Sequence, residues 1–177
     1  MALVNNKFFK ATQLTLSSGE VAASTLTRSF TDRIDDIGTV SVYYNGQLIE
    51  TIDDNPDGKF YYSVDTSAYI ITNSTALVTG NYYKIKVPGS TVWSGAGASS
   101  NAAGTLFIAS GTAVGSGTAE DVTSATPTTD ITVTTNPDYT APGYATETEG
   151  ATPHSEITLL ITDNITVSYY FDIYTEV

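Results

Sequence analysis

Few residues of this chain have side chains that could do chemistry, and they are scattered. His154 is the only histidine and cysteine is absent, so a histidine cluster or a thiolate cannot supply a metal site or a nucleophile. A lone histidine in the polar segment ATPHSEIT is usually a surface residue, and we expect no catalytic role for it. Glu147 and Glu149 are the closest non-adjacent glutamates, and paired carboxylates could hydrolyse a glycosidic bond. Tyr144 is the only aromatic residue beside them, so the sequence predicts no enzymatic activity.

The segment DDNPDG could bind calcium or form a turn. Asp53, Asn55, Asp57 and Gly58 match the first half of an EF-hand loop, in which alternate residues place oxygen ligands around the ion. The bidentate acid that should follow is missing, because position 64 is valine. Asp, Asn, Pro and Gly are also the residues that a tight turn requires. We therefore expect a turn, with calcium binding as the alternative, and predict no metal and no cofactor.

The segment GTLFIASGTAVGSGTAED, residues 104–121, has the glycine content of a phosphate-binding loop. A P-loop ends in Gly-Lys followed by Ser or Thr, and no lysine follows any glycine here. The dinucleotide fingerprint needs a third glycine and a following helix, and the segment GAGASS at residues 95–100 has neither. We therefore expect a short strand followed by a tight or mobile loop, without a bound phosphate.

Aromatic residues could form a sugar-binding surface or a protein core. Trp93 and the twelve tyrosines offer rings that stack on the apolar faces of sugars. As core residues, paired tyrosines on a strand would place one ring inward and one outward. The pairs are Tyr43/Tyr44, Tyr61/Tyr62, Tyr82/Tyr83 and Tyr169/Tyr170. Because tyrosine is enriched at protein interfaces, we expect some outward rings to form subunit contacts.

The charge of the chain is unevenly distributed. Nineteen acidic residues against seven basic ones give a net charge of −12, and all seven bases lie within residues 1–86. Such an acidic surface repels phosphates, so we expect no nucleic-acid partner. The first half is then the better candidate for contact with a partner protein. An apolar window of about 18 residues is missing, and the polar N-terminus lacks a signal-peptide core, so we expect no membrane association.

Residue types and spacing predict an all-β fold. Asn45-Gly46 suits a type I′ turn between two β-type runs, and residues 39–72 are predicted to form an antiparallel meander. Residues 20–36 fit a helix or a strand equally well. Residues 76–87 are a hairpin candidate. Residues 122–155 contain four of the six prolines and one strand candidate at 131–135, and because proline is kept out of central strands this region is expected to be an edge strand or an extended loop. The aromatic C-terminal segment should be a central strand.

Together these segments predict an antiparallel β-sandwich or barrel-like domain with a small inserted β module. At least eight short strands with turn signals every ~8–12 residues are typical of such folds. The main β domain comprises residues 1–74 and 122–177, and the inserted Gly/Thr-rich module comprises residues 75–121. Residues 1–20 could form an N-terminal arm that reaches a neighbouring subunit.

Residues 75–121 resemble a module that recurs in structural proteins of tailed bacteriophages, particularly those of cyanobacteria and marine bacteria. The similarity lies in small, aromatic and apolar residues at fixed spacing over about a quarter of the chain. The matching residues are Leu77, Gly80, Tyr83, Ile85, Gly89, Thr91, Trp93, Gly97, Ala98, Asn101, Gly104, Thr105, Phe107, Ala109, Gly111, Gly115 and Gly117. Trp93-Ser94 stands where the pattern usually has an aromatic residue and threonine.

This resemblance implies a virion setting and carries over no functional residues. We expect a capsid decoration (cement) protein on the capsid exterior, bound to the major capsid protein and self-associated as a homotrimer or homodimer. A tail fibre, baseplate or receptor-binding protein that contacts host glycans is the alternative. A depolymerase and a secreted adhesin are further alternatives, of which the first needs a cleft of carboxylates and the second a secretion signal.

Overall fold

The computed structural model describes residues 2–52, 58–123, 128–136 and 159–177, which form two β modules. Seven strands form a large sheet that curls into a half-barrel, which confirms the all-β, barrel-like prediction. In spatial order these strands are β1 (Leu3–Leu14), β11 (Ile165–Glu176), β3 (Ser41–Tyr44), β4 (Gln47–Thr51), β5 (Phe60–Asp65), β10 (Thr129–Thr135) and β2 (Thr25–Phe30). The small sheet has the order β6 (Ile71–Asn73), β9 (Thr118–Asp121), β7 (Tyr82–Val87) and β8 (Leu106–Ile108).

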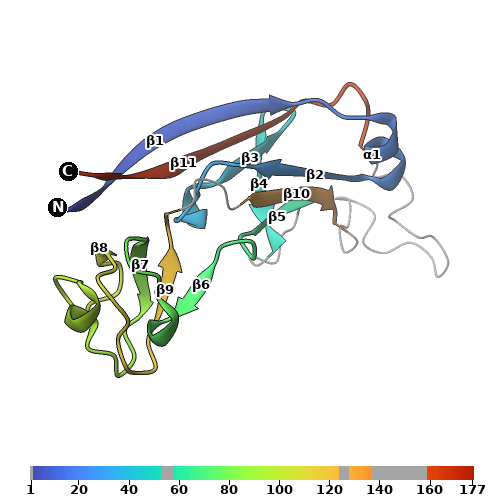
Figure 1. The fold of residues 1–177 in the computed structure, drawn as a ribbon. Coiled ribbons are helices and arrows are strands. Elements are labelled where there is room, and N and C mark those ends of the chain that lie inside the picture. The colour runs from blue at the N-terminus through green and yellow to red at the C-terminus, as the bar shows by residue number, and fades with distance from the viewer. Residues whose placement is uncertain (1, 53–57, 124–127, 137–158) are drawn as a thin grey trace, which may run out of the picture.

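The half-barrel encloses one apolar core because its strands alternate inward and outward residues. On β10, Ile131 and Val133 are buried, and on β11 the inward residues are Ile165, Val167 and Tyr169. The small module has a separate core, so each sheet buries its own apolar face. Figure 1 shows the small module beneath the end of β1 and β11 at which both chain termini lie.

The meander prediction for residues 39–72 is confirmed at its start and wrong afterwards. Asn45 and Gly46 both have positive φ, 47° and 82°, and join β3 to β4 as an antiparallel hairpin. β5 then pairs with β4 in parallel, because its direction is set by six antiparallel pairs with β10. β6 leaves this sheet and pairs with β9 in the small module.

The N-terminal residues, for which an arm was one possibility, form a strand of the chain's own sheet. β1 makes twelve consecutive antiparallel pairs with β11, which hold it in place. β11 itself lies between β1 and β3, as expected of a central strand. Residues 20–36 divide between the two predicted structures: helix α1 (Ser18–Ala23) ends at Ser24, whose φ is 52°, and β2 follows at once.

Helix α1 begins with a capping box that also anchors β2. The Ser17 N–H donates to the Glu20 carboxylate over 2.8 Å, while the Glu20 N–H donates to the Ser17 hydroxyl over 3.3 Å. Arg28 of β2 donates to the same carboxylate. The hydrogen bond from Arg28 outweighs burial and lowers the pKa of Glu20 from 4.5 to about 2. The carboxylate of Glu20 therefore stabilises the fold wherever it is ionised.

The variant Glu20→Gln is expected to lose a pH-dependent part of the protein's stability. The pKa of Glu20 is depressed in the folded state, so its contribution is fully present above pH 4.5 and is lost as pH falls toward about 2. Urea unfolding at several pH values in this window should show a shallower acid limb for Glu20→Gln than for wild type. Ser17→Ala is the control: it should cost about 1 kcal/mol at neutral pH and keep an acid limb. Identical acid limbs for Glu20→Gln and wild type would contradict this prediction.

The small module is wider than predicted and is folded differently at its start. Its strands run from Ile71 to Asp121, so the boundary at residue 75 moves to a position before β6. The expected hairpin over residues 76–87 contains one strand, β7. The preceding residues form a 3-10 turn, η3 (Ser74–Ala76), and a loop that buries Leu77. Residues 106–108 form β8, as predicted, and the strand predicted at residues 131–135 is present as β10 (Thr129–Thr135). The expectation that this strand lies at an edge was wrong, because β10 pairs with β2 on one side and β5 on the other.

Candidate functional site

Trp93 lies at the centre of the small module, so of the two alternatives for this ring, a sugar-binding surface or a protein core, the structure shows the core. Its side chain is fully buried in the 3-10 turn η4 (Trp93–Ala96), and its ring packs 5.8 Å from that of Phe107. Its indole Nε1–H donates to the Pro88 carbonyl over 3.0 Å, which satisfies the one polar group of the ring. Trp93 is therefore a structural residue.

Part of the glycine-rich segment packs around Trp93. Gly115 has a φ of 147°, and a Cβ atom on it would lie 2.4 Å from the Thr91 hydroxyl. A Cβ atom on Gly117 would lie 2.4 Å from the Pro88 carbonyl and 2.6 Å from the Trp93 ring. Glycine stands at these two positions because the backbone passes too close to its neighbours for any side chain. Gly115 and Gly117 are thus explained by close packing.

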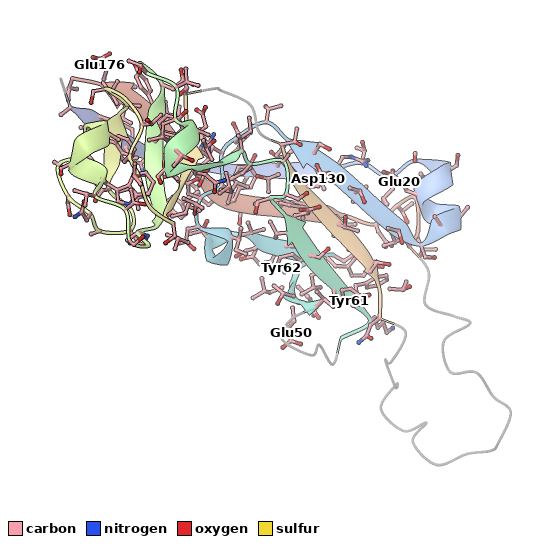
Figure 2. The ribbon with its side chains drawn as sticks, turned by 60° about the horizontal axis from the view of Figure 1, so that its bottom comes forward. Glu20, Glu50, Tyr61, Tyr62, Asp130 and Glu176 are labelled. Atoms are coloured by element: carbon pink, nitrogen blue, oxygen red, sulfur yellow. The ribbon has the colours of Figure 1, made fainter. Side chains whose placement is uncertain are left out.

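The tyrosine pairs follow the predicted alternation on three strands. Tyr62, Tyr83 and Tyr169 are buried, while their neighbours Tyr61, Tyr82 and Tyr170 are half-buried or exposed. Figure 2 shows Tyr61 and Tyr62 next to each other on β5. The pair on β3 departs from the prediction, since both rings are half-buried.

A buried ion pair joins the two modules. Arg33, in the segment after β2, donates through Nη1 to the Glu120 carboxylate of β9, and these side chains are only 7% and 0% exposed. Arg33 Nη2 donates to the Asp121 carbonyl over 3.1 Å, and its guanidinium lies 5.1 Å from the centre of the Tyr69 ring. Lys86 Nζ is 2.9 Å from the second oxygen of Glu120. Both charges are taken out of water here, so each depends on the other for compensation.

A second ion pair ties the same segment to β7 and β11. Lys84 Nζ donates to Asp35 over 2.7 Å, and the Tyr174 hydroxyl donates to the same carboxylate oxygen. Burial raises the pKa of Asp35, but the bonds from Lys84 and Tyr174 outweigh it and hold the pKa below its usual value. Burial and the neighbouring Asp35 carboxylate raise the pKa of Tyr174. We call Arg33, Asp35, Lys84, Glu120 and Tyr174 the joint, because they hold the half-barrel and the small module together.

Strands β1 and β11 form a long two-stranded ribbon that the joint supports from one side. The Asp172 N–H of β11 donates to the Arg33 carbonyl over 2.8 Å, and Asn5 of β1 donates to the Asp172 carboxylate over 2.5 Å. Tyr82 of the small module donates to Glu176 near the end of β11 over 3.1 Å. Figure 2 places Glu176 beside the small module and Glu20 at the opposite end of the molecule. The ribbon therefore runs between the two ends as a supported element.

The ribbon carries aromatic rings that remain in solvent. Phe9 and Tyr170 lie on one face with ring centres 5.3 Å apart, and they are 60% and 46% exposed. Phe8 and Phe171 lie on the other face at 5.6 Å, where Phe8 is 47% exposed. Clustered exposed aromatic residues are typical of surfaces that bind another protein. The ribbon is thus the strongest candidate for an interaction surface in the described part of the chain.

Most basic side chains of the first half are used within the molecule. Ion pairs join Lys10 to Asp32, Arg28 to Glu20, Arg33 to Glu120, Lys84 to Asp35 and Lys86 to Glu120. The first half was expected to offer its positive charges to a partner, and among the described residues β1 is the segment where this remains possible. Lys7 is exposed there and forms no ion pair with any residue that the structure describes.

Several predicted candidates lie outside the described residues. These are Asp53, Asn55, Asp57, Tyr144, Glu147, Glu149 and His154. Over the residues that are described, three or more His, Asp or Glu side chains nowhere gather as a metal site would require. A cleft of about 690 Å³ between β4 and β5 has one carboxylate, Glu50, on its described lining. In the described ranges, every helix is too short or too polar to cross a membrane.

The joint is the part of the site that sequence reasoning missed. Neither Asp35 nor Glu120 stands out in the sequence as a candidate for a site. The one hint in the sequence is that Glu120 alternates with Val122 at the end of β9, which places this acid on the same face as an apolar residue. The partner of Glu120, Arg33, lies 87 positions away in the sequence. Long-range charge pairs of this kind cannot be assigned from one sequence.

Comparisons with known proteins found no relative. Neither a scan against protein-family models nor searches of curated proteins and of solved structures gave a match.

Proposed function

We propose that the chain is a structural protein of a bacteriophage particle, and specifically a decoration protein that binds the outer surface of the major capsid protein shell and stabilises it. The observation that carries this proposal is the ribbon, which presents aromatic rings on both faces and an exposed strand at its edge. Burying such rings against neighbouring capsid subunits would supply the binding energy. The many equivalent sites of a symmetric shell would multiply it.

The joint supports a mechanical role. A protein that bridges shell subunits transmits force only if its parts hold their relative positions. Here the Arg33–Glu120 and Lys84–Asp35 pairs connect two separate cores, and both pairs are largely removed from solvent. Buried pairs of this kind favour one arrangement of the modules over others.

The phage setting of the proposal rests on the resemblance of residues 75–121. The apolar positions that carry the resemblance are buried in the core of the small module. They are Leu77, Tyr83, Ile85, Trp93, Ala98, Phe107 and Ala109. Gly89, Gly115 and Gly117, which also match, stand where the backbone approaches its neighbours too closely for a side chain. The shared pattern is therefore one that specifies a fold, which suits a module reused in several virion proteins.

The alternative is a tail fibre, baseplate or receptor-binding protein that contacts host glycans. Sugar stacking would have used Trp93 first, and Trp93 is buried. The exposed rings of the ribbon are two phenylalanines and one tyrosine, which suit protein contacts better than sugars. The decoration role is therefore the better supported of the two.

A binding assay with capsid shells tests the proposal. Shells assembled from the major capsid protein of the phage that encodes this chain would be sedimented with increasing amounts of the purified protein. We expect saturable co-sedimentation and a higher melting temperature of the shell. Phe9→Ser should weaken binding, and Val114→Ser, an exposed substitution in the small module, should not. If the protein remains in the supernatant when the shells are sedimented, and binds host cells instead, this result would favour the receptor-binding alternative.

A further inference from the structure

The outer edge of β1 has hydrogen-bonding groups that the rest of the described chain leaves unused. Ala2 and Val177 exchange both backbone hydrogen bonds, each over 2.9 Å. Pairs alternate along an antiparallel ladder, so the even-numbered residues of β1 bond to β11 and the odd-numbered ones point their N–H and C=O groups away. Asn5, Lys7, Phe9 and Ala11 all lie in this outward set, and residues 5–11 are exposed.

The opposite edge of the large sheet is protected, whereas the outward backbone groups of β1 are unpaired among the described residues, although β8 of the small module lies near part of this strand. At β2, Arg28 donates to the Thr15 carbonyl over 2.6 Å and to Glu20 of α1, so this connection covers the strand. β1 has twelve uninterrupted pairs without proline, glycine or a bulge, which are the usual devices that prevent edge pairing. The only residues of β1 that could discourage edge pairing are its two lysines, and the Lys10 ammonium forms an ion pair with Asp32 at 2.7 Å.

We propose that β1 pairs antiparallel with β1 of a second copy of this chain, on a twofold axis that passes through Phe9. An isologous contact of this kind needs a strand that is complementary to itself. β1 satisfies this requirement because it is apolar at its centre and contains no acidic residue, in a chain whose net charge is −12. Two copies repel least when they approach through this strand.

The lysines select the position of the axis. The outward N–H and C=O groups of the two copies can bond only when odd-numbered residues of one β1 lie opposite odd-numbered residues of the other. The twofold axis then passes through a residue of β1 and not between two residues. An axis at Lys7 or at Lys10 would place like charges directly opposite each other, which is destabilising. An axis at Phe8 would bring the two Lys7 side chains into diagonal contact, and these have no ion pair within the described chain.

An axis at Phe9 avoids these conflicts. It pairs Phe9 with Phe9 and Lys7 with Ala11 of the second copy, and it sets Lys10 opposite Phe8. The two Lys10 side chains become diagonal neighbours, but Asp32 already neutralises each of them. The overlap then covers residues 4–14, and the exposed aromatic rings of both copies meet at its centre.

The size of this contact predicts a weak dimer. A strand of 11 residues is about 36 Å long and a sheet about 10 Å thick, so the footprint is roughly 400 Å² per copy. Stable complexes bury about 800 Å² per partner, so we expect a dissociation constant of about 10–100 µM. High salt should tighten the dimer, because it screens the repulsion between two acidic molecules.

Cysteine cross-linking tests the axis directly, because the chain has no native cysteine. Residues that exchange hydrogen bonds lie about 5.5 Å apart at Cα, within the range that a disulfide spans. Phe9→Cys should give a disulfide-linked dimer on mild oxidation. A mixture of Lys7→Cys and Ala11→Cys, which leaves Phe9 in place, should give the mixed dimer faster than either variant gives its own. Val114→Cys, an exposed position on the small module, is the control for random collision.

Removal of one outward donor provides the second test. Ala11→Pro deletes an N–H that points away from β11, so the ladder within the chain stays intact. Analytical ultracentrifugation over a range of concentrations should show at least a tenfold weaker dimer for Ala11→Pro than for Ala11→Val. Two cross-linking results would overturn the proposal. One is a disulfide-linked dimer formed by Lys7→Cys but by no other β1 variant, and the other is that no β1 variant forms a dimer faster than the Val114→Cys control. So would a wild-type chain that is monomeric at several hundred micromolar. Capsid binding is measured separately by co-sedimentation. Because Phe9→Ser removes a ring that both contacts use, Ala11→Pro, which leaves the rings of the ribbon in place, separates loss of the dimer from loss of capsid binding.

Discussion

Replacing Glu120 with alanine is expected to destabilise the protein by about 3–5 kcal/mol, because it leaves the buried guanidinium of Arg33 without its partner. Arg33 is 7% exposed and cannot turn into solvent without leaving the joint. Glu120 also faces Lys86, whose half-exposed ammonium can reach water, so most of the loss comes from Arg33. Urea unfolding followed by circular dichroism and by the fluorescence of Trp93, the only tryptophan, measures this loss.

A double variant separates the ion pair from simple packing. Arg33→Met with Glu120→Leu removes both buried charges and keeps similar volumes, and such replacements are often neutral or stabilising. We expect the double variant to be more stable than Glu120→Ala by at least about 2 kcal/mol. A loss below about 1 kcal/mol for Glu120→Ala would show that the joint does not bury its charges in solution.

The second large effect is expected for Gly117→Ala, at about 3 kcal/mol or more, because its new methyl group meets fixed backbone. The added Cβ would lie 2.4 Å from the Pro88 carbonyl, 2.6 Å from the Trp93 ring and 2.8 Å from the Thr91 hydroxyl. None of these atoms can move away without disturbing the centre of the small module. Trp93 fluorescence should report unfolding of this module at lower urea than in wild type.

Gly111→Ala is the matched control from the same segment. A Cβ on Gly111 has no atom within 4 Å among the described residues, and its φ is outside the left-handed region. This variant should stay within about 0.5 kcal/mol of wild type or be slightly more stable. Equal effects of the two substitutions would contradict the packed arrangement of the glycine-rich segment.

The features that could be predicted from the sequence are local ones. Alternation of apolar and polar residues specifies a strand by itself, and it correctly located β10 and β8. The Asn45-Gly46 turn was predictable because few residues other than Asn and Gly adopt two successive positive φ angles. The buried members of three tyrosine pairs followed from the same period of two.

The features that could not be predicted depend on contacts between distant segments. β4 and β5 pair in parallel only because β10, some 65 residues later in the chain, sets the direction of β5. An arm was left open for the N-terminal residues because the partner of β1, β11, lies at the other end of the sequence. The role of Trp93 stayed open between a sugar-binding surface and a core, because one sequence does not reveal which aromatic ring a core will enclose.

The most direct test of the decoration role is the number of copies of this chain in each purified phage particle, measured by quantitative mass spectrometry against the major capsid protein. A decoration protein occupies equivalent sites over the whole shell, so we predict hundreds of copies per particle. A count of a few to a few tens would place the chain in the tail or a fibre. Its absence from the particle would contradict the proposal that it is a virion protein.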